Sequence, residues 1–269
     1  MTAIAVTIAG SDSGGGAGIQ ADLKTFSALG VYGASVITAI TAQNTRGVVA
    51  VEDISPTIVD AQIDAVFSDL AVGAVKIGMV SREATIAIIA EGLRRYGKMA
   101  ILDPVMVATS GDPLLRPDAI AALREQLLPL ALIATPNLPE AALLTGRAIA
   151  MHEAEMAHQA EIILKAGARS VLIKGGHGRG PESTDVFFDG GEPVRLMASR
   201  IETTNDHGTG CTLSAAIAAG LARGLPLVDA VVAAKDYLHA AIVAAGDLNV
   251  GQGRGPVHHF HRWWRPDAR

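Results

Sequence analysis

The sequence predicts an α/β protein with a mainly parallel central sheet, helices on both faces and an antiparallel hairpin at one edge. Short apolar, β-branched runs alternate with segments whose apolar residues recur at helical spacing, as in repeated strand–helix units. Apolar residues make up 49% of the 269 residues and charged residues 18%, which suits a sheet buried on both faces. No linker-like stretch divides the chain, so we expect a single domain over residues 1–269.

The first strand–helix unit contains a glycine-rich loop. Residues 3–8 have the composition of a buried parallel strand, and residues 19–29 carry apolar side chains at helical spacing. Between them, residues 10–18 form a loop in which bare backbone can approach a ligand. Residues 16–21 also match the loose G-x-G-x-x-A dinucleotide pattern. The second strand, 35–40, does not end in the acidic residue that would hold a ribose, so we reject a dinucleotide site.

Strand and helix patterns then alternate along the chain. Ser55 and Pro56 begin a helix with a capping side chain and a proline in its first turn. The further strands are expected at 74–79, 99–102, 132–134 and 171–174, and the further helices at 81–96, 117–128, 153–166, 212–223 and 226–244. Residues 184–188 and 194–197 flank an Asp-Gly-Gly turn, which predicts the antiparallel edge hairpin.

The stretch 203–211 predicts an anion-binding turn at the start of a helix. Gly208 and Gly210 allow successive N–H groups to point the same way, and the helix adds its unpaired first-turn donors and positive dipole end. Such a turn holds an anion, most often phosphate. Cys211, the single cysteine, falls where this field would lower a thiol pKa and favour the thiolate. The alternative is a buried, inert cysteine.

Other polar residues follow the expected strands, at the edge where ligands bind in parallel sheets. Asp103 and Glu140 are candidates to hold Mg²⁺, although each also fits ordinary turn or cap chemistry. Lys174 ends a strand and can reach phosphate oxygens. An anion turn, paired acids and a lysine are the parts that phosphoryl transfer needs. Gln43 and Met79, with the glycine loop, would then line a pocket for a flat, neutral heterocycle.

Composition excludes several other classes of function. A net charge of −5 and the absence of basic runs interleaved with aromatic residues argue against a nucleic-acid partner. One cysteine allows no internal disulfide, and no stretch has the length of a signal or membrane segment. We therefore expect a cytoplasmic protein with no membrane partner. The histidine- and tryptophan-containing segment 258–264 is interpreted as a packed tail rather than a metal site, because no acidic or sulfur ligand lies nearby.

These motifs together resemble the hydroxymethylpyrimidine and phosphomethylpyrimidine kinases of thiamine biosynthesis, which belong to the ribokinase-like superfamily. The resemblance runs nearly end to end. It is carried by residues 9–12, 15–22, 42–47, 76–79, 110–115, 135–141, 174–177, 208–216 and 255–261. The Gly-Thr-Gly turn is shared across the superfamily, whereas the cysteine after it and the Gln-Ala-Asp sequence at 20–22 are more particular.

The resemblance implies a three-layer ribokinase-like fold, ATP and Mg²⁺ as cofactors, and a homodimer. It implies two successive phosphorylations, first of 4-amino-5-hydroxymethyl-2-methylpyrimidine and then of its monophosphate. By match, the pyrimidine contacts are Gly10, Gln43, Met79 and Val105. The Mg²⁺ carboxylates are Asp103 and Glu140, and the nucleotide-phosphate contacts are Lys174, Asn137 and Thr209. Gly208, Thr209 and Gly210 correspond to the anion hole, and Cys211 stands where other superfamily members place an aspartate base.

One departure and two alternatives stay open at this point. Asp206 occupies a position where the family commonly has threonine; it would point away, pair with an arginine or weaken nucleotide affinity. A pyridoxine-type vitamin kinase is the main rival, since related pockets accept either ring. A non-catalytic ATP-binding regulator is the rival from another class, and it is disfavoured by the joint presence of Asp103, Glu140, Lys174 and Cys211.

Overall fold

The computed structural model describes residues 1–106, 117–176 and 180–264. The motif at 110–115 and His177 from the sequence comparison therefore lie outside the described residues. Among the described residues, no helix has the length and apolar character that a bilayer crossing requires.

The described residues form one nine-stranded sheet with strand order β3-β2-β1-β4-β5-β6-β7-β8-β9. The strands are β1 (Ile4–Asp12), β2 (Tyr32–Asn44), β3 (Gly47–Asp53), β4 (Ala74–Ile77), β5 (Ala100–Leu102), β6 (Ala131–Ala134), β7 (Val171–Ile173), β8 (Glu182–Phe188) and β9 (Val194–Ser199). All neighbouring pairs from β2 to β7 are parallel, whereas β3 on β2, β8 on β7 and β9 on β8 are antiparallel. The mainly parallel sheet and its edge hairpin are confirmed.

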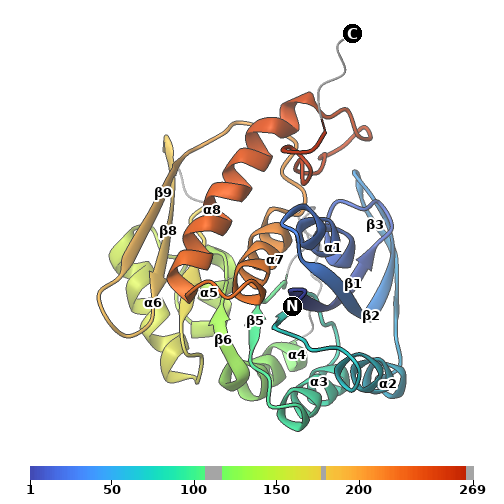
Figure 1. Ribbon diagram of the computed structural model, residues 1–269. Coiled ribbons are helices and arrows are strands. Elements are labelled where there is room, and N and C mark those ends of the chain that lie inside the picture. Colours follow the sequence, from blue (N-terminus) through green and yellow to red (C-terminus); the bar gives the residue numbers. More distant parts are fainter. Residues whose placement is uncertain (107–116, 177–179, 265–269) are drawn as a thin grey trace.

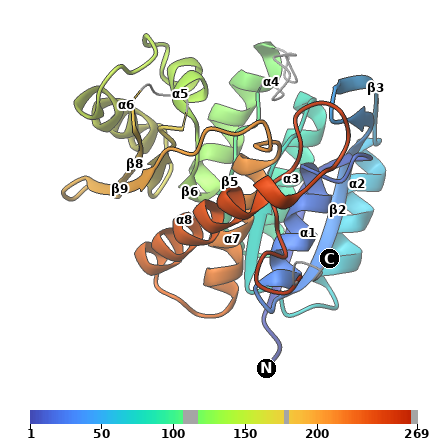
Figure 2. The ribbon, with the colours of Figure 1, turned by 90° about the horizontal axis from the view of Figure 1, so that it is seen from above.

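Helices cover both faces of this sheet and complete three layers (Figures 1 and 2). The helices are α1 (Gly18–Ala28), α2 (Pro56–Phe67), α3 (Glu83–Arg95), α4 (Pro117–Ala122), α5 (Leu138–Thr145), α6 (Glu153–Lys165), α7 (Thr209–Ala222) and α8 (Leu227–Ala244), with short turns η1 (Leu123–Leu127), η2 (Leu128–Leu130) and η3 (Ala245–Asp247). Helices α1, α7 and α8 share one apolar core with the sheet, and α2 to α6 share the other. Each helix thus packs against the sheet through the face on which its apolar residues recur.

Two elements were missed from the sequence. Strand β3 was not expected because it is an edge strand whose residues 49–52 are all exposed, so it has no buried face to produce an alternating pattern. Helix α5 is also absent from the helices expected from the sequence. Asn137 and Glu140 form a reciprocal capping box, and Pro139 lies in the first turn, where a missing N–H has no consequence. The expected helix 117–128 also breaks into α4, a π-turn and a 3₁₀ turn.

The parallel strands bring the predicted site residues to one edge of the sheet. Asp12 ends β1, Asp103 follows β5 and Lys174 follows β7, and these are the carboxyl ends of parallel strands. Lys174 is tied to the residues after β6 by a backbone hydrogen bond from its N–H to the carbonyl of Pro136, 2.8 Å away. Side chains far apart in sequence therefore face a common space.

Candidate active site

A cavity of about 950 Å³ lies at the carboxyl ends of the parallel strands. Every residue assigned to the site from the sequence lines this cavity: Gly10, Gln43, Met79, Asp103, Val105, Asn137, Glu140, Lys174, Gly208, Thr209, Gly210 and Cys211. The acceptor candidates come from β1, β2 and the segments after β4 and β5, and the phosphate candidates come from the segments after β5, β6 and β7 and from α7. The structure thus brings the whole set together, while the chemical role of each residue stays a prediction.

A buried charge cluster forms the centre of the cavity. The ammonium of Lys174 lies 2.7 Å from Oδ1 of Asp103 and 3.9 Å from Oε2 of Glu140. Ser214 donates a 3.2 Å hydrogen bond to Oδ2 of Asp103. Burial alone would raise the pKa of Asp103, but Lys174, Lys76 and the hydrogen bond from Ser214 together outweigh it and hold that pKa below its usual value. Asp103 is therefore ionised, and Lys174 is a cation held between two acids.

Glu140 differs from Asp103 in its ionisation. Its Oε2 accepts the backbone N–H of Asn137 at 2.7 Å, which closes the capping box of α5. Burial raises the pKa of Glu140 to about 7, with Lys174 opposing that shift and Asp103 adding to it. At neutral pH this carboxyl is poised between its two forms, and a nearby cation would ionise it.

These two carboxylates suit a magnesium ion that is held mainly by its substrate. Among residues 1–106, 117–176 and 180–264, no group of three His, Cys, Asp or Glu side chains is placed to hold a metal. Mg²⁺ commonly takes only one or two protein carboxylates and fills its octahedron with phosphate oxygens and water. Burial keeps the pKa of Glu140 raised although Lys174 lies near it, so a further cation bound there would favour its ionised form. Glu140, with Asp103 beside it, therefore fits Mg²⁺ bound together with a nucleotide.

The raised pKa of Glu140 predicts a pH dependence of nucleotide binding. We expect binding of Mg²⁺ with ADP to require the Glu140 carboxylate and so to release the proton that Glu140 carries below about pH 7. We expect the affinity for Mg²⁺ with ADP to fall about five- to tenfold when the pH is lowered from 7 to 6. Calorimetry in buffers of different ionisation enthalpy measures the proton uptake or release.

ADP itself also titrates in this pH range. The variant Glu140→Gln is the control that isolates the contribution of Glu140. The variant should lose the part of the proton release that belongs to Glu140, and unchanged proton release would contradict the assignment. The linked effect on folding has the opposite direction. A folded-state pKa above the usual value of 4.5 means that the folded protein binds more protons, so the stability contributed by this group decreases as pH rises from about 4.5 through 7.

The first turn of α7 lies directly against the charge cluster. Gly208 caps the helix in the left-handed region, with φ of +80°. A Cβ atom on Gly210 would lie 3.3 Å from Nζ of Lys174 and 3.5 Å from Oδ2 of Asp103. First-turn N–H groups of a helix have no intrahelical partners and carry the positive end of its dipole. The turn and Lys174 therefore present positive charge and N–H donors to the same part of the cavity.

The expectation of a Cys211 thiolate is wrong for the free protein. Burial raises the pKa of this thiol to about 11, and the nearby Lys76 only partly offsets that effect, while Asp22 and Asp103 add to it. The helix start was recognised from the sequence, but burial and the two acids around the sulfur were not. Cys211 therefore carries its proton at neutral pH.

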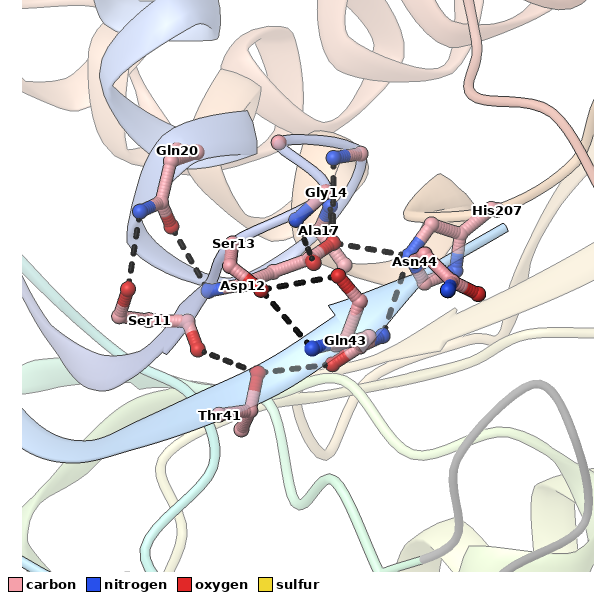
Figure 3. A network of polar contacts seen from close by, with 12 residues as sticks. Ser11, Asp12, Ser13, Gly14, Ala17, Gln20, Thr41, Gln43, Asn44 and His207 are labelled. Atoms are coloured by element: carbon pink, nitrogen blue, oxygen red, sulfur yellow. Dashed lines mark hydrogen bonds and ion pairs between the residues drawn. The ribbon is translucent and has the colours of Figure 1, made fainter. Parts of the chain in front are cut away.

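The glycine loop forms the other end of the cavity. A Cβ atom on Gly10 would lie 2.5 Å from Cε of Met79, so the glycine leaves the methionine room to line the pocket. The loop is organised by the buried carboxylate of Asp12, which accepts backbone N–H groups from Gly14, Gly16 and Ala17 at 2.8–3.1 Å (Figure 3). Asp12 was missed as a site residue, although an aspartate preceding several glycines is a signal for such a loop.

Comparison with known proteins identifies the family. The phosphomethylpyrimidine kinase family model matches residues 12–258. The chain belongs to this family. The hydroxymethylpyrimidine/phosphomethylpyrimidine kinase of Rhizobium meliloti is 78% identical over 98% of this chain and all of its own length, and that of Escherichia coli is 53% identical over 97% and 98%. The crystal structure of an ADP complex of Bacillus subtilis pyridoxal kinase has a TM-score of 0.89 at 38% identity, covering 96% of this chain and 98% of its own.

The structure shows which partner Asp206 has in this member of the phosphomethylpyrimidine kinase family. Asp206 pairs with Arg254 through both nitrogens of one edge of the guanidinium, with Nε to Oδ1 at 2.8 Å. The backbone N–H of Arg254 donates to the carbonyl of Thr45, and the N–H of His207 donates to the carbonyl of Gly255. The C-terminal segment thus bridges the β2–β3 turn and the anion turn, and it brings an arginine that offsets the aspartate.

This pairing predicts unequal effects of the two single substitutions. Arg254→Ala leaves the charge of Asp206 unopposed beside the anion turn, so the KM for ATP is expected to rise about three- to tenfold at low salt. Asp206→Asn leaves a free cation and should change that KM by less than about threefold. Steady-state kinetics at low and high salt check both, because screening should shrink the Arg254→Ala effect. Equal effects of the two changes would contradict the pairing.

The C-terminal tail of this kinase is packed as the sequence predicted. His258 lies against Trp264, and His261 lies against Tyr237. Burial lowers the pKa of His259 to about 3, so its ring is neutral; its Nε2 lies 3.1 Å from the hydroxyl of Thr212 in α7. These histidines therefore hold the tail against α7 and α8.

Proposed function

We propose that this chain transfers the γ-phosphoryl group of ATP to the hydroxyl of 4-amino-5-hydroxymethyl-2-methylpyrimidine, and then phosphorylates the resulting monophosphate to the diphosphate. The observation that carries the proposal is the cluster in which Lys174 lies between two buried acids, directly against the first turn of α7. Membership of the phosphomethylpyrimidine kinase family supports the choice of acceptor.

The residues of the cluster act mainly by positioning and charge. Lys174 and the N–H groups of the turn from Gly208 to Cys211 hold the transferring phosphoryl group, whose negative charge is spread over its oxygens. Glu140 and Asp103 would hold Mg²⁺, which would neutralise phosphate charge when bound. Met79 and Val105 supply apolar surface for the pyrimidine ring. The pyrimidine alcohol and its monophosphate are therefore both phosphorylated at this one phosphate-holding centre.

Cys211 keeps its place beside the reacting groups but is not the proton acceptor. Because its pKa is about 11, little thiolate exists in the free protein at neutral pH. A loose phosphoryl-transfer transition state needs little activation of the nucleophile, so the acceptor hydroxyl can lose its proton late. The thiol lines the cavity and belongs to the same turn as the phosphate donors. Because the protonated thiol cannot take a further proton, we assign the late proton to an oxygen of the transferred phosphoryl group, and we assign Cys211 a place near the reacting oxygen as a hydrogen-bonding partner.

The deciding experiment is mass analysis of products from ATP, Mg²⁺ and the pyrimidine alcohol. We expect the monophosphate first and the diphosphate later, with two ADP formed per diphosphate. Formation of monophosphate alone would refute the second step, and absence of ADP above the no-acceptor control would refute the kinase assignment.

A pyridoxal-kinase side activity is the second candidate, favoured by the likeness to the pyridoxal kinase structure. Initial rates with pyridoxal and with the pyrimidine alcohol, compared as kcat/KM, separate the two. A higher kcat/KM for pyridoxal would reverse their order.

For the assembly, we propose a cytoplasmic homodimer. The β2–β3 edge exposes the apolar side chains of Ile40, Val49 and Val51, which is more than an isolated edge strand ordinarily leaves in water. A reduced single cysteine and an ATP-dependent reaction support the compartment. Light scattering should give twice the chain mass, and Val49→Asp should shift it to the monomer; a monomeric wild type would refute the dimer.

A further inference from the structure

The backbone that follows Lys174 is held by two charged side chains at the β8–β9 edge of the sheet. The N–H of Gly175 donates a buried hydrogen bond to Oδ1 of Asp185 in β8, 2.8 Å away. The carbonyl of Gly176 accepts a 2.7 Å hydrogen bond from the guanidinium of Arg200, which directly follows β9. An anion thus binds the N–H of one residue and a cation binds the carbonyl of the next, so the chain leaves β7 in one defined direction.

The carboxylate of Asp185 takes the place of a backbone acceptor where the pairing of two strands ends. Strands β7 and β8 pair in antiparallel register through all three residues of β7. Beyond β7, the N–H of Gly175 meets the side chain of Asp185 instead of a backbone carbonyl. A Cβ atom on Gly175 would lie 1.9 Å from the carbonyl oxygen of Thr184, so the glycine backbone lies directly against β8. Strand β8 therefore fixes where the chain runs immediately after Lys174.

These backbone contacts determine where the side chain of Lys174 begins. Its own N–H is held by the carbonyl of Pro136 at 2.8 Å, and the next N–H along the chain is held by Asp185. At the far end of the side chain, the ammonium lies 2.7 Å from Oδ1 of Asp103. A lysine side chain is a flexible four-carbon stem. A fixed backbone is therefore what allows its charge to be presented at one point in the cavity.

Asp185 is itself held by a buried lysine. Its Oδ2 lies 2.7 Å from the ammonium of Lys235 in α8, while Oδ1 binds Gly175. The side chains of Asp185 and Lys235 are only 4% and 11% exposed, and both residues line the cavity. A buried ion pair often contributes little net stability relative to apolar residues of similar size. Stability alone therefore does not explain this pair, and no step of the proposed phosphoryl transfer uses it.

We propose that Asp185 is a positioning residue for phosphoryl transfer. By holding the N–H of Gly175, with Arg200 on the carbonyl of the following residue, it fixes the backbone from which Lys174 reaches the transferring phosphoryl group. Lys235 supplies the opposite charge that allows the carboxylate to be buried. Because a misplacement of about 1 Å can cost on the order of a hundredfold in rate, the contact affects kcat more than acceptor binding. The inference rests on the proposed kinase reaction, since it names what places the phosphate-binding lysine of that reaction.

Two double variants separate the hydrogen bond to Gly175 from the ion pair. Both carry Lys235→Met, so that no unpaired cation is left; one adds Asp185→Asn and the other adds Asp185→Leu. Asparagine and leucine are similar in size, but only asparagine keeps an oxygen that can accept the N–H of Gly175. We expect kcat of the leucine variant to be about ten- to hundredfold below that of the asparagine variant. The KM for the pyrimidine alcohol should agree within about twofold between them. Equal kcat values per folded molecule would overturn the inference.

Arg200→Ala tests the same backbone if the leucine variant does not fold. Arg200 is only partly buried, so its replacement is better tolerated by the fold. The change should lower kcat about three- to tenfold, the scale of one hydrogen bond to a charged group, and leave the KM for the alcohol unchanged. An unchanged kcat would overturn the inference. Wild-type turnover is measured first. Its absence refutes the proposed function, while an active wild type with equal kcat in the two double variants refutes only the role of Asp185.

Discussion

Replacing Gly208 with alanine is expected to lower kcat for phosphoryl transfer by at least about a hundredfold, the scale of losing an anion-hole donor. A Cβ atom at this position would lie 1.9 Å from the carbonyl oxygen of Gly16, which is backbone and has no rotamer to adopt. The two glycine-containing loops must therefore separate, and the anion turn moves away from Lys174. Rapid-quench measurement of a single turnover checks the chemical step directly.

Gly224→Ala is the matched control for this prediction. Gly224 has φ of +86°, close to the +80° of Gly208, but nothing lies within 4 Å of its added Cβ. Both variants therefore carry the strain of an alanine in the left-handed region, about 1–2 kcal/mol. Only Gly208→Ala meets the clash with Gly16. Similar rates of phosphoryl transfer in the two variants would show that the contact between the loops does not matter.

Lys174→Met is expected to lower kcat/KM on the order of a thousandfold and to destabilise the fold by about 3–5 kcal/mol. The ammonium is the cation between Asp103 and Glu140, and its loss leaves two buried acids facing each other. One of them must then stay protonated in the folded state, which raises its pKa above the unfolded value. Stability of the variant should therefore rise as pH falls from 8 toward 5, which denaturant unfolding at several pH values measures.

Lys76→Met controls for the loss of any buried lysine. Lys76 pairs with Asp22 at 2.8 Å, both side chains are fully buried, and neither residue lines the cavity. Its removal should lower stability by a comparable amount, but kcat of the folded protein should fall far less than in Lys174→Met. If the two variants lost activity equally, the effect would belong to stability rather than to the phosphate-holding role of Lys174.

Much of the fold could be predicted from the sequence, because burial of one face of a helix or strand makes apolar residues recur at a regular spacing. The parallel strands and the helices that pack on them were recognised from apolar runs and helical spacing, whereas β3, an exposed edge strand, carries no such period. The convergence of Asp103 and Lys174 followed from one rule, that the carboxyl ends of parallel strands lie together. That rule needs no knowledge of side-chain contacts.

Properties that depend on contacts between distant residues could not be predicted. The pKa of Cys211 is set by burial and by Asp22 and Asp103, which no local pattern around the cysteine reveals. The partner of Asp206 lies 48 residues further along the chain. The contacts of His207 with Asp12 and Gln43 join residues far apart in the sequence, so they appear only in the folded molecule.

The C-terminal segment, which bridges the β2–β3 turn and the anion turn, is the last part of the active site to be synthesised. The N–H of His207 is held by the carbonyl of Gly255, and Thr45 holds the N–H of Arg254. A chain still emerging from the ribosome therefore has every strand of its sheet and the helix that receives phosphate before it has a finished wall around the heterocycle. Any truncation before residue 254 removes Arg254 and leaves Asp206 unopposed beside the anion turn, so it should raise the KM for ATP as Arg254→Ala does; the last segment to be synthesised is therefore the one that completes the site.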